Sequence, residues 1–483
     1  MSVGRIHLLI NNEEVPTENY MEVRDPGRLS DVVGLVAKGS TQHVGMAVEA
    51  AHQAFLSWHK TPLHERMALL KQAASLLEKE ASDLAVMVSR ENGMLLSTTK
   101  LEITHLAISA IKNTVELAQT FFQETRVEDA QSWVSVEKRP IGVIAGIVPW
   151  NAPLVLTMQK VAPALIAGNT IVIKPSPFAP MGVSTVLKKM AALFPPGVIS
   201  VIHGDADVGK ALTTHPLVRK VSFTGGGRTA AHVMRDAADA LKSVHFELGG
   251  NDPAIVLDDA ILDEVVPKIA AGVFRRSGQV CFAIKRIYVP QHLYDSFHAK
   301  LCEYVDSFKI GHGLNEQATF GPLNNKQQYQ YVQDLTARLK NSQATVSHLG
   351  TKLEPDNWEN GYYLQPAVVR DVEPGQEIVT CEQFGPVIPL ISYRTEEEVV
   401  EMANQTEYGL GSSVWSADPD RALRLARDLE AGMTFVNGHG QTPLGYRHMP
   451  FGGVKQSGIG RENGEVGLAE YIEYHAINLH RTT

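Results

Sequence analysis

Cys281 stands alone in the stretch "SGQVCFA", residues 277–283 of a 483-residue chain that has three cysteines. Cys302 and Cys381 are far from it in sequence, and no CxxC or HExxH pattern offers a metal site. A cysteine without such partners is most often a small buried hydrophobic side chain. The small and polar residues before Cys281 leave its sulfur open to approach, so we also consider it as a nucleophile.

Two other polar side chains complement this thiol. Asn151 in "VPWNAP" follows an apolar run, where its carboxamide N–H could meet a developing negative charge. Glu247 in "FELGG" precedes two glycines, so substrate or water could approach its carboxylate closely. A nucleophile, a base and an oxyanion donor are the minimal parts for covalent chemistry on a carbonyl. Taken singly, each residue also has an ordinary structural reading, as a turn former, a satisfied carboxylate or a core thiol.

A parallel sheet is predicted to position these residues. Short apolar runs begin near 141, 170, 198, 220 and 243, and segments of helical composition separate them. This alternation is typical of a parallel sheet covered on both faces, which binds ligands beyond the carboxyl ends of its strands. Asn151, Lys174, Gly225 and Glu247 each come at or just after a strand end, so we expect them at one edge of the sheet.

Helices are predicted over 44–125, and a second α/β unit is predicted from about 250 to 440. The glycines of "FTGGGRTA" lie between a predicted strand and a predicted helix, where amide groups can face a phosphate. They do not match GxGxxG, so an ordinary Rossmann dehydrogenase is not supported.

Composition restricts the partners. The formal net charge is −9 with no basic stripe, which argues against a nucleic-acid partner. No apolar run reaches the length of a signal sequence or of a membrane span. Three widely spaced cysteines indicate free thiols in a reducing compartment, so we expect a cytoplasmic protein without a metal site.

An ordered series of motifs across nearly the whole chain resembles the aldehyde dehydrogenase superfamily. Glu247 precedes Cys281 by 34 residues, the separation that this family shows between its base and its nucleophile. The motifs are "VPWNAPL", "GNTIVIKPS", "VSFTG", "FELGGNDP", "GQVC", "EQFGP", "YGLGSSVW" and "PFGGVKQSGIGRENG".

The resemblance implies a catalytic role for three residues. Cys281 would attack an aldehyde and form a thiohemiacetal, whose oxyanion the Asn151 side chain and the Cys281 backbone N–H would hold. Hydride transfer to NAD or NADP would leave a thioester, and Glu247 would activate the water that hydrolyses it.

The resemblance also implies a cofactor site. Lys174 would contact the adenosine ribose, and Glu382 the nicotinamide ribose. The implied cofactor-binding residues are Val148, Trp150, Lys174, Ser176, Pro177, Gly225, Gly226, Glu382 and Phe384. Pro177 stands where many NAD-preferring members carry a glutamate that repels a 2′-phosphate, so NAD is favoured only slightly over NADP.

The implied architecture is an aldehyde dehydrogenase-like α/β fold. A Rossmann-like cofactor domain would take residues 1–124 and 140–249, and an α/β catalytic domain would take 250–462. A small β element, 125–139 with 463–483, would join subunits into a homodimer or homotetramer.

The substrate is expected to be a small-molecule aldehyde. Ala152 implies a roomy pocket wall, and Phe451 is expected at the entrance. Arg275 and Arg276 could bind the carboxylate of a semialdehyde or could pair with nearby acidic residues. Two alternatives are a CoA-acylating enzyme, whose family members usually lack the glutamate at 247, and a non-catalytic binding or structural protein of the same fold.

Overall fold

The computed structural model describes residues 4–481 and contains two large sheets. The first has parallel strands at its centre, as predicted, with antiparallel strands at its two ends. In spatial order its strands are β22 (Gly458–Ile459), β12 (Ser243–Glu247), β11 (Val218–Thr224), β8 (Val143–Ile147), β9 (Thr170–Lys174), β10 (Ile199–Val201), β2 (Leu8–Ile10) and β3 (Glu13–Val15).

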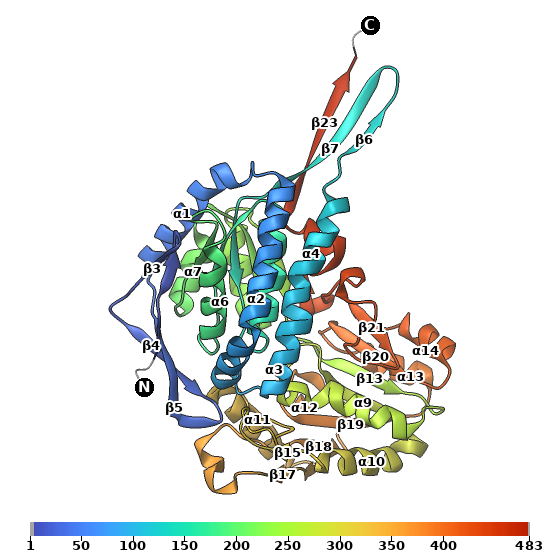
Figure 1. Cartoon of the computed structure of the whole chain (residues 1–483). Coiled ribbons are helices and arrows are strands. Elements are labelled where there is room, and N and C mark those ends of the chain that lie inside the picture. The colour runs from blue at the N-terminus through green and yellow to red at the C-terminus, as the bar shows by residue number, and fades with distance from the viewer. Residues whose placement is uncertain (1–3, 482–483) are drawn as a thin grey trace.

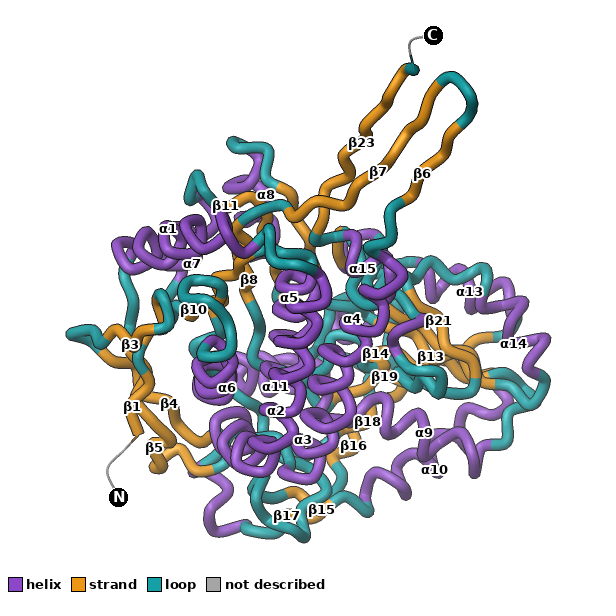
Figure 2. Tube along the Cα trace, turned by 45° about the horizontal axis from the view of Figure 1, so that its top comes forward, coloured by secondary structure: helices purple, strands orange, loops and turns teal. Residues whose placement is uncertain are grey.

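Helices cover both faces of this sheet because successive strand residues point to opposite sides. In β9, Ile171 and Ile173 belong to one core and Val172 to the other. On the first face lie α2 (Leu63–Asn92), α4 (Ile108–Phe121), α5 (Pro153–Ile166) and α6 (Met181–Ala191). On the second lie α1 (Thr41–Trp58), α7 (Ala206–Thr214) and α8 (Gly227–Ala238). Figure 2 shows α5 and α6 packed side by side. The resulting sandwich holds the strand ends rigidly.

The second sheet is also largely parallel, with helices on both faces. Its strands are β16 (Thr345–His348), β18 (Ala367–Arg370), β19 (Val387–Tyr393), β14 (Ile284–Pro290), β13 (Asp252–Val256), β20 (Gly411–Trp415) and β21 (Met433–Val436). Its helices are α9 (Leu262–Phe274), α10 (Tyr294–Asp306), α11 (Lys326–Leu339), α13 (Glu396–Asn404) and α14 (Pro419–Ala426). This sheet and its helices occupy the region where a second α/β unit is predicted, from about 250 to 440.

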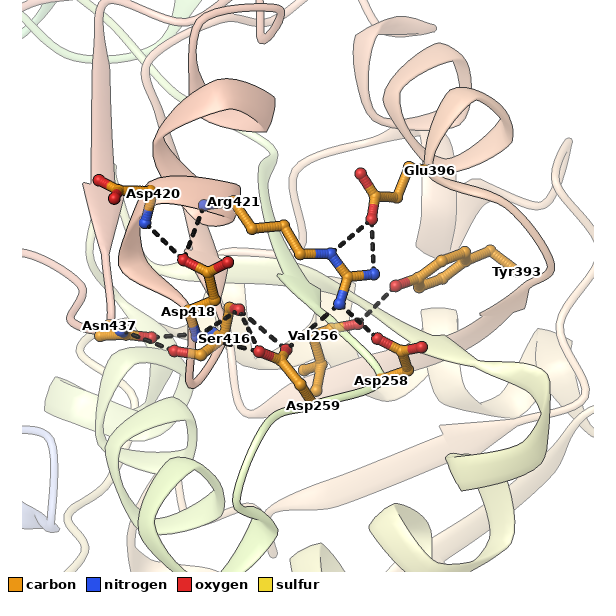
Figure 3. A network of polar contacts seen from close by, with 10 residues as sticks. All are labelled: Val256, Asp258, Asp259, Tyr393, Glu396, Ser416, Asp418, Asp420, Arg421 and Asn437. Carbon is orange, nitrogen blue, oxygen red and sulfur yellow. Dashed lines mark hydrogen bonds and ion pairs between the residues drawn. The ribbon is translucent and has the colours of Figure 1, made fainter.

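A polar network lies at the carboxyl end of β13, a central strand of this second sheet (Figure 3). The guanidinium of Arg421 on α14 lies 2.6 Å from Asp258, after β13, and 2.6 Å from Glu396, on α13. The hydroxyl of Ser416 donates to the carboxylate of Asp259 at 2.7 Å. These contacts tie two helices to the central strand, so the sheet is held at the end remote from Cys281.

A third sheet projects from the body of the molecule (Figure 1). It consists of β6 (Thr125–Glu128), β7 (Ser132–Pro140) and β23 (Ile472–His480). The strand β23 pairs antiparallel with β7 over its whole length. Some of its apolar side chains are exposed to solvent: Val127 is 73% exposed and Tyr474 is 62% exposed. The two segments predicted to form one small β element therefore do pair.

The sequence prediction missed a three-stranded sheet near the N-terminus, formed by β1 (Gly4–Ile6), β4 (Tyr20–Asp25) and β5 (Arg28–Ala37). The buried carboxylate of Asp25 lies 3.0 Å from His312 Nε2, which links this sheet to the second half of the chain.

Within residues 4–481, no helix is long and apolar enough to span a membrane. The same residues contain no cluster of three or more histidine, cysteine or carboxylate side chains suited to a metal ion.

Candidate active site

The predicted edge of the first sheet exists. In the register of neighbouring strands, Glu247 is opposite Thr224, Phe223 is opposite Ile147, and Ile147 is opposite Lys174. The carboxyl ends of four parallel strands therefore meet in one row, where such sheets bind their ligands. Asn151 follows β8 and directly precedes α5, so it lies at the same edge.

Cys281 follows a short 3₁₀ helix, η2 (Arg275–Gly278), whose backbone is strained. Arg276 and Ser277 adopt φ values of 51° and 58°, a left-handed conformation that non-glycine residues avoid. Two contacts hold it in place. The guanidinium of Arg276 pairs with the buried carboxylate of Glu102, and the hydroxyl of Ser277 donates to the carbonyl of Gly321 at 2.8 Å. The surroundings therefore fix the path of the chain into Cys281.

Gln279 joins this loop to its neighbours. Its side-chain oxygen accepts from the Asn324 backbone N–H at 2.9 Å, and its side-chain amide donates to the Arg276 carbonyl at 3.0 Å. Its own carbonyl accepts from the side-chain amide of Asn151 at 3.0 Å. One residue therefore sets the position of the predicted oxyanion donor relative to the predicted nucleophile.

Cys281 and Asn151 line the same cavity of about 290 Å³. Ala152 lines it as predicted, and so do Phe451, Val155, Leu156, Phe282 and Tyr446, although the predicted place of Phe451 at the entrance is not tested. The only basic groups on its described wall are His105, Arg275 and Arg276, and none of the described residues that line it carries a carboxyl group. The cavity has apolar walls and a cationic region, which suits a small organic substrate.

The surroundings of Cys281 favour its neutral thiol over the thiolate. Burial raises its pKa to about 12, Lys285 lowers it, and the carboxyl groups of Glu382, Glu247 and Asp252 raise it further. Because the thiolate is the nucleophilic form, the sulfur must lose its proton for attack. Cys302 packs against the core of the second sheet and Cys381 is exposed, so neither shares the cavity.

Glu247 lies outside the lining of this cavity. It is 2% exposed, and neither carboxylate oxygen has a hydrogen-bond partner among the described residues. Its Oε1 lies 3.4 Å from Nε2 of the buried His245, which occupies the same face of β12. Burial and Glu462 raise the pKa of Glu247 well above its usual range, while Lys160 and Arg461 lower it. An unsatisfied buried carboxyl of this kind is typical of functional sites.

The N-terminus of α8 fits the phosphates of a dinucleotide. Gly226 is the residue that caps this helix, and a Cβ on Gly226 or Gly227 would meet no atom within 4 Å. Open space above unpaired N–H groups can hold an anion. Gly225 is tied back by donating its N–H to the carbonyl of Glu247 at 3.1 Å.

The lysine and the aromatic residues predicted to surround the cofactor lie near the same edge. Burial lowers the pKa of Lys174 to about 8, and Asp205 partly opposes this shift. The carbonyl of Lys174 accepts from the N–H of Val148 at 3.1 Å. The rings of Trp150 and Phe384 pack edge to face at 5.5 Å. Their arrangement fits the cofactor that the sequence implies.

Ser176 and Pro177 follow β9. The hydroxyl oxygen of Ser176 accepts from the backbone N–H of Phe178 at 3.3 Å, which forms a turn after the strand. Pro177 is exposed and lines an open groove beside Phe178 and Asn324. A side chain at 177 is therefore free to face a ligand.

Glu382 approaches the glycines that follow Glu247. Its Oε1 accepts from the Gly250 N–H at 3.1 Å and lies 3.2 Å from the ammonium of Lys285. A Cβ on Gly249 would lie 2.2 Å from Glu382 Oε2, so only glycine allows this approach.

Sequence reasoning missed three residues of the site: His245, Gln279 and Lys285. His245 and Lys285 act through side-chain contacts with the nearby Glu247 and Cys281, and Gln279 acts through its backbone carbonyl, which accepts from the distant Asn151 side chain. Spacing within a single sequence carries no signal for such contacts, although Gln279 does stand in the quoted motif "GQVC".

Comparison with known proteins agrees with this architecture. A model described as the aldehyde dehydrogenase family matches residues 13–477. A glutarate-semialdehyde dehydrogenase of Pseudomonas putida is 37% identical over 470 residues, which are 96% of this chain and 95% of that protein.

Solved structures are similar over nearly the full length. An NADP-dependent enzyme of E. coli has a TM-score of 0.93 at 33% identity, covering 99% of this chain and 98% of that one. A betaine aldehyde dehydrogenase from Staphylococcus aureus in complex with NAD+ has a TM-score of 0.94 at 30% identity, covering 98% of this chain and 95% of that one.

The chain belongs to the aldehyde dehydrogenase family. It is an NAD(P)-dependent oxidoreductase that acts on the aldehyde group of its substrate. The predicted α/β fold class and the predicted enzyme class are confirmed.

Gly249→Ala tests the approach of Glu382. The added methyl group must displace the carboxylate, so we expect kcat/KM for the nicotinamide cofactor to fall about tenfold to a hundredfold, the usual effect of a small misplacement. Steady-state kinetics with varied cofactor measures it. Gly375→Ala is the control, because a Cβ there meets no atom within 4 Å. Equal kinetics for both variants would contradict a close fit at Gly249.

Proposed function

We propose that Cys281, Asn151 and Glu247 carry out aldehyde oxidation in this chain. The observation that carries the proposal is the meeting of three features at one edge of the first sheet. A thiol and a carboxamide share one cavity, and a buried carboxyl without hydrogen-bond partners among the described residues lies close enough to raise the pKa of that thiol.

In the first half-reaction the sulfur of Cys281, as the thiolate, adds to the carbonyl carbon. The carbonyl π electrons move to oxygen, and the oxyanion takes hydrogen bonds from the Asn151 amide and from the Cys281 backbone N–H. The hydride acceptor for this carbon would be supplied by bound NAD(P), held by residues such as Lys174 and Glu382. With the hydride gone, the carbon–oxygen double bond re-forms and leaves a thioester on Cys281.

In the second half-reaction Glu247 removes a proton from water as the water oxygen attacks the thioester carbon. The carbon–sulfur bond breaks, the carboxylic acid leaves, and the Cys281 sulfur regains its charge. A raised pKa makes Glu247 a stronger base than an ordinary carboxylate. The presence of this glutamate favours water over CoA as the acyl acceptor.

Glu247→Gln separates the two half-reactions. The amide cannot take the proton of water, so we expect one equivalent of reduced cofactor per site to form in a rapid burst and steady-state turnover to fall at least about a hundredfold. Stopped-flow absorbance at 340 nm measures both. Glu465→Gln, an exposed position on α15 (Gly464–Ala469), is the control. Unchanged turnover in Glu247→Gln would remove Glu247 from the mechanism.

For the cofactor, we propose that NAD is accepted with only a slight advantage over NADP. Lys174 and the open N-terminus of α8 offer contacts to either dinucleotide. Pro177 supplies no negative charge that would repel a 2′-phosphate. The similar proteins of known structure include both an NADP-dependent enzyme and one in complex with NAD+.

Pro177→Glu is expected to discriminate against NADP. A carboxylate at this exposed position would repel the 2′-phosphate, so the ratio of kcat/KM for NAD to that for NADP should rise about tenfold or more. Pro177→Gln has the same length without the charge and should leave the ratio near the wild-type value. If Pro177→Glu keeps the wild-type ratio of kcat/KM for NAD to that for NADP, the adenosine ribose does not lie beside residue 177.

For the substrate, we propose an aldehyde that carries an anionic group. Arg276 is engaged by Glu102, with only 8% of its side chain exposed. Arg275 is 42% exposed and lies 3.8 Å from the same carboxylate, so its guanidinium can meet a ligand in the cavity. A carboxylate is the natural partner of such a group. The name of the Pseudomonas putida relative points to a substrate of this kind.

Arg275→Gln tests this charge. We expect kcat/KM for a semialdehyde with a terminal carboxylate to fall about tenfold to a hundredfold, the loss of one charge-assisted hydrogen bond. The neutral aldehyde of equal chain length should be oxidised as before. Arg424→Gln, exposed on α14, is the control. Equal losses for both substrates would show that Arg275 does not bind the anionic group.

We also propose the division into a cofactor domain (1–124 and 140–249), a catalytic domain (250–462) and a β element (125–139 and 463–483). The exposed apolar side chains of β6 and β23 support subunit contact through this element, as a homodimer or homotetramer. The cytoplasmic location stays a prediction.

A further inference from the structure

Lys285 is a buried cation at the start of β14, four residues after Cys281. Its side chain is only 3% exposed. The ammonium donates to the carbonyl of Val280 at 3.0 Å and to the carbonyl of Cys281 at 2.5 Å, and a longer contact of 3.5 Å reaches the carbonyl of Ala283. An ammonium has three donors, so one side chain gathers the carbonyls around the nucleophile into one cluster.

The same ammonium also contacts a carboxylate. It lies 3.2 Å from Oε1 of Glu382, and this oxygen also accepts from the Gly250 N–H. Gly250 belongs to the turn that follows Glu247. Lys285 therefore connects the Cys281 loop, the turn after the predicted base and the predicted ribose ligand.

Most of the ionisable groups that act on the Cys281 thiol are acidic. The charged groups that act on it are the carboxyls of Glu382, Glu247 and Asp252 and the ammonium of Lys285. Asp252 is itself buried, and burial raises its pKa to about 7 while Lys285 lowers it. Three acidic groups thus oppose a thiolate at Cys281, and Lys285 is the one cation among these four groups.

We propose that Lys285 is a positioning residue for aldehyde oxidation. Its ammonium holds the backbone of residues 280–283 and supplies the positive charge that stabilises the Cys281 thiolate. The inference rests on the proposed role of Cys281 as the nucleophile. Holding the Val280 carbonyl also fixes the peptide plane that contains the backbone N–H of Cys281, and so limits how this N–H can turn away from the oxyanion.

Loss of a purely structural lysine would also disturb folding, so the experiment must measure the effect of the lysine's charge on the Cys281 thiol. Removing one partner of a buried ion pair leaves the other uncompensated, whereas replacing both partners is often neutral. Lys285→Met should therefore disturb the thiol more than Lys285→Met combined with Glu382→Gln, because the double variant removes one charge of each sign.

The experiment measures alkylation of Cys281 in the full-length enzyme. Below its pKa a thiol reacts in proportion to its thiolate fraction, and one unit of pKa is a tenfold change in rate. We expect iodoacetamide at pH 8 to label Lys285→Met about tenfold more slowly than wild type. Lys285→Arg and the double variant should recover most of the rate. Peptide mass spectrometry assigns the label to Cys281 rather than to Cys302 or Cys381.

A second reagent separates charge from access. Iodoacetate carries a negative charge, so loss of the lysine should slow it more than it slows iodoacetamide, whereas a distorted cavity should slow both equally. Lys268→Met, exposed on α9, is the control and should behave as wild type. If Lys285→Met does not fold, the double variant and Lys285→Arg still carry the comparison of reagents.

Failure of the proposed role of Lys285 can be distinguished from failure of the proposed nucleophile. Equal slowing of both reagents, or wild-type rates in Lys285→Met, would overturn the role of Lys285. Aldehyde oxidation that survives complete labelling of Cys281 in the wild-type enzyme would instead overturn the proposed nucleophile, whatever Lys285 does.

Discussion

The active site depends on the strained backbone before Cys281. Arg276 and Ser277 occupy a left-handed conformation that costs about 1–3 kcal/mol per residue, so their surroundings must impose it. The imposing contacts come from α3 (Leu96–Glu102), which supplies Glu102, and from the segment near Gly321. A sulfur presented on such a loop has a defined direction because a helix and a loop segment far away in sequence hold it.

Burial then decides the chemistry of the groups that meet there. Transfer of a charge from water to a protein interior is unfavourable, so the pKa values of Cys281, Glu247 and Asp252 all rise. Burial therefore disfavours the charged forms of these groups, and nearby cations oppose that effect. The buried ion pair of Lys160 and Glu462, 2.8 Å apart, provides such a cation beside Glu247.

Much of the fold followed from sequence, because near-continuous apolar strands separated by helices leave few arrangements open. The edge that holds Asn151, Lys174 and Glu247 could be predicted from strand ends alone. The sheet formed by β1, β4 and β5 was missed because its strands mix exposed, half-buried and buried residues and so lack the near-continuous apolar pattern of the central strands. The orientation of Glu247 away from the cavity could not be predicted, since the segment around Gly452, about 200 residues later in the chain, packs against its carboxylate.

The short strand β22 gives β12 its outer neighbour, and Gly458 stands directly opposite Glu247 in this pairing. An entire second α/β unit lies between these two residues in the chain. During synthesis the strand that bears Glu247 therefore emerges long before the segment that closes its edge, and until then it offers unpaired backbone groups to any neighbouring chain. Docking of this late segment is therefore what gives β12 its outer neighbour and pairs these backbone groups.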